Sequence, residues 1–122
     1  MYTPDQLARR LRVLAASGAA LAAISVALAA YAAHAVAGPA QTSLYTAAIF
    51  AFGHGVALAA LAPPARLRIQ FFTLSGLLLG TLLFSGGIVV RYLLDRSLGL
   101  APFGGGLLIV SWLLYAVASL RR

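Results

Sequence analysis

Apolar residues fill four long blocks of this chain, and charged residues occur almost only where the blocks end. The blocks cover about residues 11–36, 43–61, 69–90 and 101–120. A helix that crosses the ~30 Å hydrocarbon core of a bilayer needs roughly 20 such residues. The pattern therefore predicts an all-α, polytopic membrane protein: an antiparallel bundle of four transmembrane helices that forms a single domain over residues 1–122.

The residues around the first block indicate where its helix begins and ends. Thr3, Pro4 and Gln6 are typical of an N-cap, a first helical position and the acceptor of a capping box. We expect the first helix to begin near Thr3. We expect Gly38 and Pro39 to end it, because both residues favour chain reversal after a helix.

Composition excludes a water-soluble domain, since 62% of residues are hydrophobic, 9% are charged and the mean hydropathy is +0.97. Cysteine is absent, which excludes disulfides, thiolate nucleophiles and metal sites with cysteine ligands. The net charge of +7 comes from arginines at the block edges. Membrane topology explains this placement better than nucleic-acid binding does.

The positions of the arginines also predict the orientation of the protein in the membrane. One side of the predicted membrane protein carries seven of them: Arg9, Arg10, Arg12, Arg66, Arg68, Arg121 and Arg122. The other side carries Arg91 and Arg96. Cytoplasmic segments carry the basic excess, so we expect both ends in the cytoplasm.

A cleaved secretory signal ending at Ala33, His34 and Ala35 is the alternative interpretation of the first block. The apolar stretch of this block, however, is longer than a signal core of about 7–15 residues.

Four polar residues lie inside the blocks at one predicted depth: Ser25, His54, Thr81 and Ser111. Each is eleven residues, about 16 Å along a helix, from an outer helix end placed near residue 36, 43, 92 or 100. An unsatisfied polar group in hydrocarbon costs roughly 2–7 kcal/mol. His54 is therefore either a site that accepts a proton or a ligand, or a neutral histidine bonded to a neighbouring hydroxyl group.

The second histidine, His34, lies near the outer end of the first block. Its depth differs from that of His54 by roughly 13 Å, so one haem iron cannot bind both unless a second chain supplies a ligand. We expect His34 to join Tyr31, Arg91 and Asp95 in an outer polar belt, in which Arg91 and Asp95 pair on one helix face. The sequence predicts no cofactor and no metal.

Glycines and alanines within the blocks predict close packing of the helices, because small side chains let helix backbones approach in a membrane. The third and fourth blocks contribute Gly76, Gly80, Gly87, Gly104 and Gly105. The first two blocks contribute Gly18 and Gly53.

Three short motifs carry a family resemblance: Phe52-Gly53-His54, Leu83-Phe84-Ser85-Gly86 and Pro102-Phe103-Gly104-Gly105. Together they resemble the YgdD-like family of small bacterial membrane proteins, the domain of unknown function 423, over about residues 11–120. The chain departs from the family at Ala51, where a glutamine is usual, and at Ala101, where a threonine is usual. The resemblance implies a four-helix protein of the bacterial cytoplasmic membrane and no known activity.

The acidic residues are only Asp5 and Asp95, so paired carboxylates and a Ser/His/Asp arrangement are both excluded. We expect a protein without catalytic activity, an accessory or scaffolding subunit of a larger membrane assembly. Its expected partners are the lipid bilayer and a membrane protein or a further copy of itself, with no nucleic acid. The alternative is a small transporter or apolar-ligand-binding protein that uses a polar layer of His54, Ser25, Thr81, Ser111 and Ser85.

Overall fold

The computed structural model describes residues 3–121, which fold into four α-helices. The helices are α1 (Pro4–Ala35), α2 (Gly38–Leu61), α3 (Arg68–Leu93) and α4 (Ala101–Ser119). Each helix is long and apolar enough to cross a bilayer. The prediction of an all-α protein with four helices of membrane-spanning length is therefore confirmed.

The first turn of α1 is held by a reciprocal cap. The Thr3 hydroxyl accepts a hydrogen bond from the Gln6 backbone N–H at 3.2 Å, and the Gln6 side-chain oxygen accepts one from the Thr3 N–H at 2.9 Å. The helix begins where its sequence predicts. Its 32 residues span roughly 48 Å, which exceeds the ~30 Å thickness of a bilayer's hydrocarbon core.

The turn between α1 and α2 is shorter than the sequence predicts. Helix α1 ends at Ala35, and α2 already begins at Gly38, five residues before the predicted start at residue 43. The expectation that Gly38 and Pro39 only terminate the first helix is wrong. Gly38 adopts a φ of +71°, which reverses the chain, and Pro39 occupies the first turn of α2, where its missing N–H costs no hydrogen bond.

The other two connections differ in how they are held. Residues 62–67 link α2 to α3, and the Gln70 side-chain oxygen accepts hydrogen bonds from the N–H groups of Arg66 and Leu67, both at 2.9 Å. This bond pair joins the loop to the first turn of α3. Helix α3 continues to Leu93, three residues past its predicted end at residue 90, and residues 94–100 then lead to α4.

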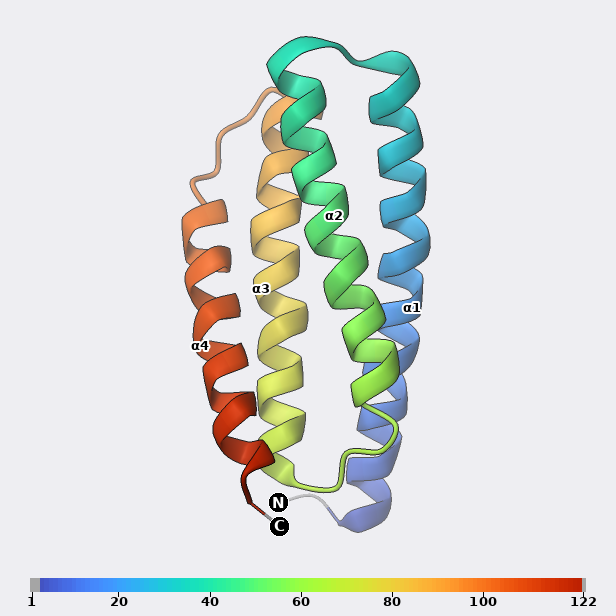
Figure 1. Cartoon of the computed structure of the whole chain (residues 1–122), viewed down its shortest axis with the longest axis vertical. Coiled ribbons are helices and arrows are strands. Elements are labelled where there is room, and N and C mark those ends of the chain that lie inside the picture. Colours follow the sequence, from blue (N-terminus) through green and yellow to red (C-terminus); the bar gives the residue numbers. More distant parts are fainter. Residues whose placement is uncertain (1–2, 122) are drawn as a thin grey trace.

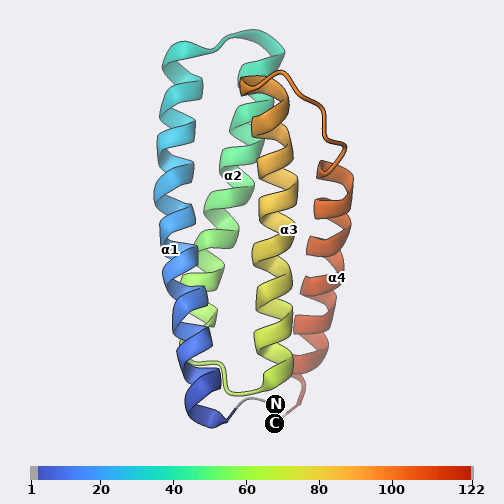
Figure 2. The same cartoon turned by 180° about the vertical axis from the view of Figure 1, so that it is seen from behind.

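The four helices form two hairpins, α1 with α2 and α3 with α4, which meet mainly through α2 and α3 (Figure 1). Successive helices alternate in direction, as both views show (Figures 1 and 2). The two chain ends and the α2–α3 loop therefore lie at one end of the molecule. Among residues 3–121, the backbone of α4 approaches only that of α3, and α1 touches α3 over a small area.

Apolar side chains fill the interior and also cover the outside. The core includes Leu11 and Leu14 of α1, Leu58 of α2, and Leu74 and Leu77 of α3. Yet large apolar side chains on the outer surface remain more than 60% exposed: Ile24, Ile49, Phe103 and Leu113 are examples. Such a surface suits lipid and not water, and with four apolar helices it indicates a multi-pass membrane protein.

Candidate functional site

His54 lies partly buried on α2, at the seam where α2 faces α4 without backbone contact. Its Nδ1 atom is 2.8 Å from the carbonyl oxygen of Phe50, one turn earlier in α2. Its Nε2 atom accepts a hydrogen bond from the indole N–H of Trp112 on α4, at 3.0 Å. The imidazole therefore connects the two hairpins.

The two partners define the tautomer of this imidazole. A carbonyl oxygen only accepts hydrogen bonds, and an indole N–H only donates them. Nδ1 of His54 therefore carries the N–H group, while Nε2 offers its lone pair to Trp112. This tautomer is the one that forms the bond between the helices.

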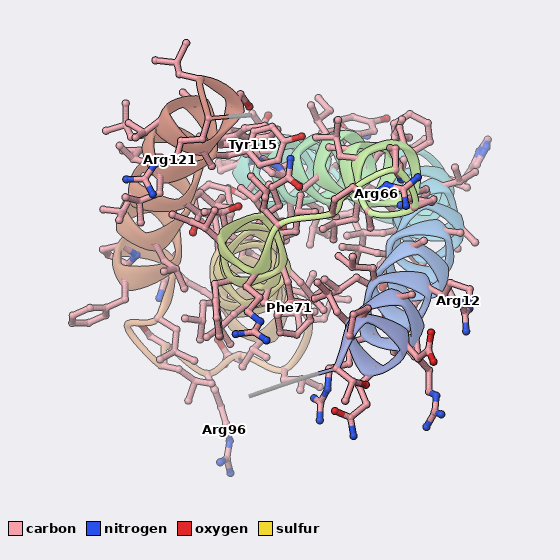
Figure 3. The ribbon with its side chains drawn as sticks, turned by 90° about the horizontal axis from the view of Figure 1, so that it is seen from below. Arg12, Arg66, Phe71, Arg96, Tyr115 and Arg121 are labelled. Atoms are coloured by element: carbon pink, nitrogen blue, oxygen red, sulfur yellow. The ribbon has the colours of Figure 1, made fainter. Side chains whose placement is uncertain are left out.

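Aromatic rings continue this contact across three helices. The ring of Phe50 lies 6.0 Å from that of His54, at 11°, and 4.8 Å from that of Phe84 on α3, at 52°. Trp112 lies 5.9 Å from His54 and 6.1 Å from Tyr115, which Figure 3 shows reaching from α4 toward α2. We call these five residues the aromatic row. Such ring pairs contribute about 0.5–1.5 kcal/mol each beyond their burial.

The other residues of the predicted polar layer lie elsewhere. Ser25 donates to the carbonyl three residues earlier in α1, at 2.8 Å, and Thr81 donates to the carbonyl four residues earlier in α3, at 2.7 Å. Ser111 packs against Gly76 at the α3–α4 contact. Among residues 3–121, none of these hydroxyl groups is hydrogen-bonded to His54 or to another member of the layer. The residues of the predicted layer therefore do not form a hydrogen-bonded cluster around His54, and their shared depth stays a prediction.

Two further hydrogen bonds join α2 to its neighbours. The Ser85 hydroxyl on α3 donates to the Ala47 carbonyl at 2.8 Å, and the Gln41 amide donates to the Ala32 carbonyl of α1 at 3.0 Å. With the Trp112 bond, α2 is linked to each of the other three helices. Sequence reasoning missed Gln41 because it lay in a segment interpreted as a loop, and missed Trp112 because a lone tryptophan in an apolar block resembles lipid-facing surface.

Glycines bring α3 and α4 together. The contact contains Gly76, Gly80 and Gly87 of α3 and Gly104 of α4. A methyl group added to Gly104 would lie 2.7 Å from the Gly80 carbonyl oxygen and would collide with the backbone of Phe84. No side chain fits there. Gly105 lies beside the contact, where an added methyl group would meet only the Phe84 ring at 3.8 Å, so Gly105 is not needed for close approach.

A second glycine pair joins α1 and α2. A methyl group on Gly55 would lie 2.6 Å from the Gly18 carbonyl oxygen, and the reverse substitution meets the Gly55 carbonyl oxygen at 2.5 Å. Gly53, which the sequence suggested for this contact, has no atom of another element within 4 Å of such a group. The contact uses Gly55 because its face of α2 points toward α1, two residues and more than half a turn away from Gly53.

The predicted outer belt is exposed, and its expected ion pair does not form. Tyr31, His34, Arg91 and Asp95 all lie on the surface, toward the end of the molecule with the α1–α2 turn and residues 94–100. Helix α3 ends at Leu93, so Asp95 lies beyond it with a φ of +55°. The two residues therefore do not share a helix face. The Arg91 guanidinium instead lies over the ring of Tyr92, 5.5 Å from its centre.

Four membrane-length helices joined by a few internal hydrogen bonds and glycine contacts define a small multi-pass membrane protein. The family model described as "Protein of unknown function (DUF423)" matches residues 28–105, more than half of the chain. The protein therefore belongs to the DUF423 family, as its motifs suggested. The match contains His34, His54 and Ser85 and reaches Gly105. Comparisons with curated proteins and with solved structures give no match.

Proposed function

We propose that this protein is a non-catalytic accessory or scaffolding subunit of a larger assembly in the bacterial cytoplasmic membrane. It crosses the membrane four times as an antiparallel bundle, with both ends in the cytoplasm. The four apolar helices and the DUF423 family support the membrane part of this proposal. The bacterial location follows from the resemblance to small bacterial membrane proteins.

The distribution of arginines supports the orientation. The end of the molecule with the chain termini and the α2–α3 loop carries most of the described arginines: Arg9, Arg10, Arg12, Arg66, Arg68 and Arg121. Figure 3 looks onto this end and shows Arg12, Arg66 and Arg121 around it. Arg91 and Arg96 belong to the opposite end. Because cytoplasmic segments carry the basic excess, this distribution supports a cytoplasmic position for that end.

The scaffolding role is supported by one observation: most polar groups predicted to form the central layer already have hydrogen-bond partners in the chain. Both nitrogens of His54 are bonded, and so are the hydroxyl groups of Ser25, Thr81 and Ser85. Within residues 3–121, no buried side-chain nitrogen or oxygen lacks a hydrogen-bond partner. A transporter or an enzyme needs polar groups that exchange partners with a substrate. Here the bonds of His54 and Ser85 join two helices each, while Ser25 and Thr81 bond to carbonyls of their own helix, which suits a structural subunit.

Purification of the full chain from native membranes in mild detergent tests this proposal, with wild type and His54→Ala compared. We expect both to co-purify with another membrane protein at a constant ratio. We also expect His54→Ala to melt earlier, because loss of the Trp112 bond costs about 0.6–2 kcal/mol. A wild-type chain that purifies alone would contradict the proposal. So would a His54→Ala chain that keeps its melting temperature but loses uptake or binding of a small molecule.

A further inference from the structure

Helices α1 and α3 meet near the end of the molecule that carries the termini, and a groove of about 420 Å³ lies between them there. Its lining includes Arg9, Arg10, Val13 and Leu14 of α1 and Phe71 and Leu78 of α3. Figure 3 looks onto this end and shows Phe71 between the two helices. The groove is separate from the aromatic row and from the close α3–α4 contact.

The chemistry of the groove changes along its length. Arg9 and Arg10 lie at its mouth, and the Arg9 side chain is exposed. One helical turn further, about 6 Å into the apolar layer, the α1 wall becomes Val13, which is 60% exposed, and Leu14. The only described carboxylate at this end, Asp5, does not line the groove. Ser17 and Ser75 also line the inner part of the groove, which is otherwise apolar. A positive mouth above a mainly apolar channel fits an anion that carries a hydrocarbon chain.

We propose that this groove binds one anionic glycerophospholipid of the cytoplasmic leaflet. The phosphate lies at Arg9 and Arg10, and one acyl chain lies between α1 and α3 along Val13 and Leu78. Guanidinium groups bind phosphate oxygens through paired N–H donors, and basic pockets between transmembrane helices on the cytoplasmic side suit anionic head groups. A free phosphate ion would leave the apolar part of the groove unfilled, whereas a lipid fills both parts.

This inference uses the proposed topology only to name the leaflet and does not depend on the scaffolding role. Its test is native mass spectrometry of the full chain in detergent, with phosphatidylglycerol or phosphatidylcholine of identical acyl chains added. We expect phosphatidylglycerol to bind preferentially. The double variant Arg9→Gln with Arg10→Gln should weaken that binding about 25-fold, from roughly fivefold for each arginine.

The matched control removes the same charge from the same end of the protein. Arg12 and Arg66 line a neighbouring groove, between α1 and the end of α2, so the double variant Arg12→Gln with Arg66→Gln should keep phosphatidylglycerol affinity within about twofold. Ser75, a half-buried residue of α3, also lines the lipid groove. Ser75→Phe should fill the apolar channel and abolish lipid binding with no change of charge, while circular dichroism shows an intact helical fold.

Four results would overturn the lipid site. Equal binding of phosphatidylglycerol and phosphatidylcholine would mean that the groove does not recognise an anionic head group. An equal loss of phosphatidylglycerol affinity in both double variants would mean that the affinity depends on the net charge of the protein and not on Arg9 and Arg10. Displacement of phosphatidylglycerol by millimolar inorganic phosphate, or full binding to Ser75→Phe, would leave an anion site without an acyl chain. Retention of partner proteins in the same preparations reports separately on the scaffolding proposal.

Discussion

The contact between α3 and α4 leads to a sharp prediction, that Gly104→Ala destabilises the protein. An added methyl group at this position meets the Gly80 carbonyl oxygen at 2.7 Å and the backbone of Phe84 at a still shorter separation. Both obstacles are backbone atoms of α3, so no rotamer change can relieve them. Helix α4 must therefore move away from α3, the only helix whose backbone it approaches among the described residues.

The size of the effect follows from two opposing contributions to stability, the cost of overpacking and the gain in helix propensity. Overpacking of a close contact costs about 1–3 kcal/mol, and a clash with backbone belongs to the upper part of that range. Alanine also favours a helix over glycine by about 1 kcal/mol, which opposes the loss. Gly106→Ala, on the same helix, gains the same propensity but meets no atom of another element within 4 Å. The difference between the two variants therefore isolates the clash, and we expect about 2–3 kcal/mol.

Equilibrium unfolding in mixed micelles of a mild detergent and dodecyl sulfate, followed by circular dichroism, measures this difference. We expect Gly104→Ala to unfold at a clearly lower dodecyl sulfate fraction than Gly106→Ala, with wild type between the two because Gly106→Ala gains about 1 kcal/mol of helix propensity. Equal midpoints for the two variants would refute the reasoning, because they would mean that α4 does not pack through Gly104. Greater stability of Gly104→Ala would refute it as well.

The same unfolding assay checks three further predictions. Trp112→Phe keeps an aromatic ring but removes the donor to His54, and should cost about 0.5–1.5 kcal/mol; an unchanged midpoint would mean that the bond is absent in the micelle. Ser85→Ala should cost about 0.6 kcal/mol and at most about 1.7, through loss of the bond to the Ala47 carbonyl, whereas a gain of stability would contradict this role. Gly55→Ala should cost about 1–3 kcal/mol, while Gly53→Ala, which meets no such obstacle, should gain up to about 1 kcal/mol of helix propensity; the reverse order would exclude the Gly18 contact.

The number and length of the helices could be predicted because each apolar block is long enough to cross a bilayer and ends at charged or capping residues. The start of α1 at Thr3 is a local signal, since the cap involves residues only three apart. The predicted start of α2 at residue 43 is too late. Gly38 and Pro39 favour the end of one helix and the beginning of the next equally well. Only the tertiary arrangement decides between the two.

The candidate site could be predicted only in part. Depth along a helix can be counted from sequence, but the direction of each side chain around the helix depends on how the helices pack. Ser25, Thr81 and His54 therefore share a predicted depth and yet bond to different groups. The link between His54 and Trp112 joins residues 58 positions apart, and no periodic pattern in one helix indicates it.

Four crossings with both ends in the cytoplasm are the central claim, and cysteine labelling tests it most directly. The chain has no cysteine, so single cysteines can be introduced at exposed loop positions without a background. Ser97→Cys lies between α3 and α4, and Pro64→Cys lies between α2 and α3. With a membrane-impermeant maleimide, we predict that Ser97→Cys reacts in intact cells and that Pro64→Cys reacts only after permeabilisation. Labelling of Pro64→Cys in intact cells with protection of Ser97→Cys would contradict the orientation, and labelling of both would contradict the four crossings.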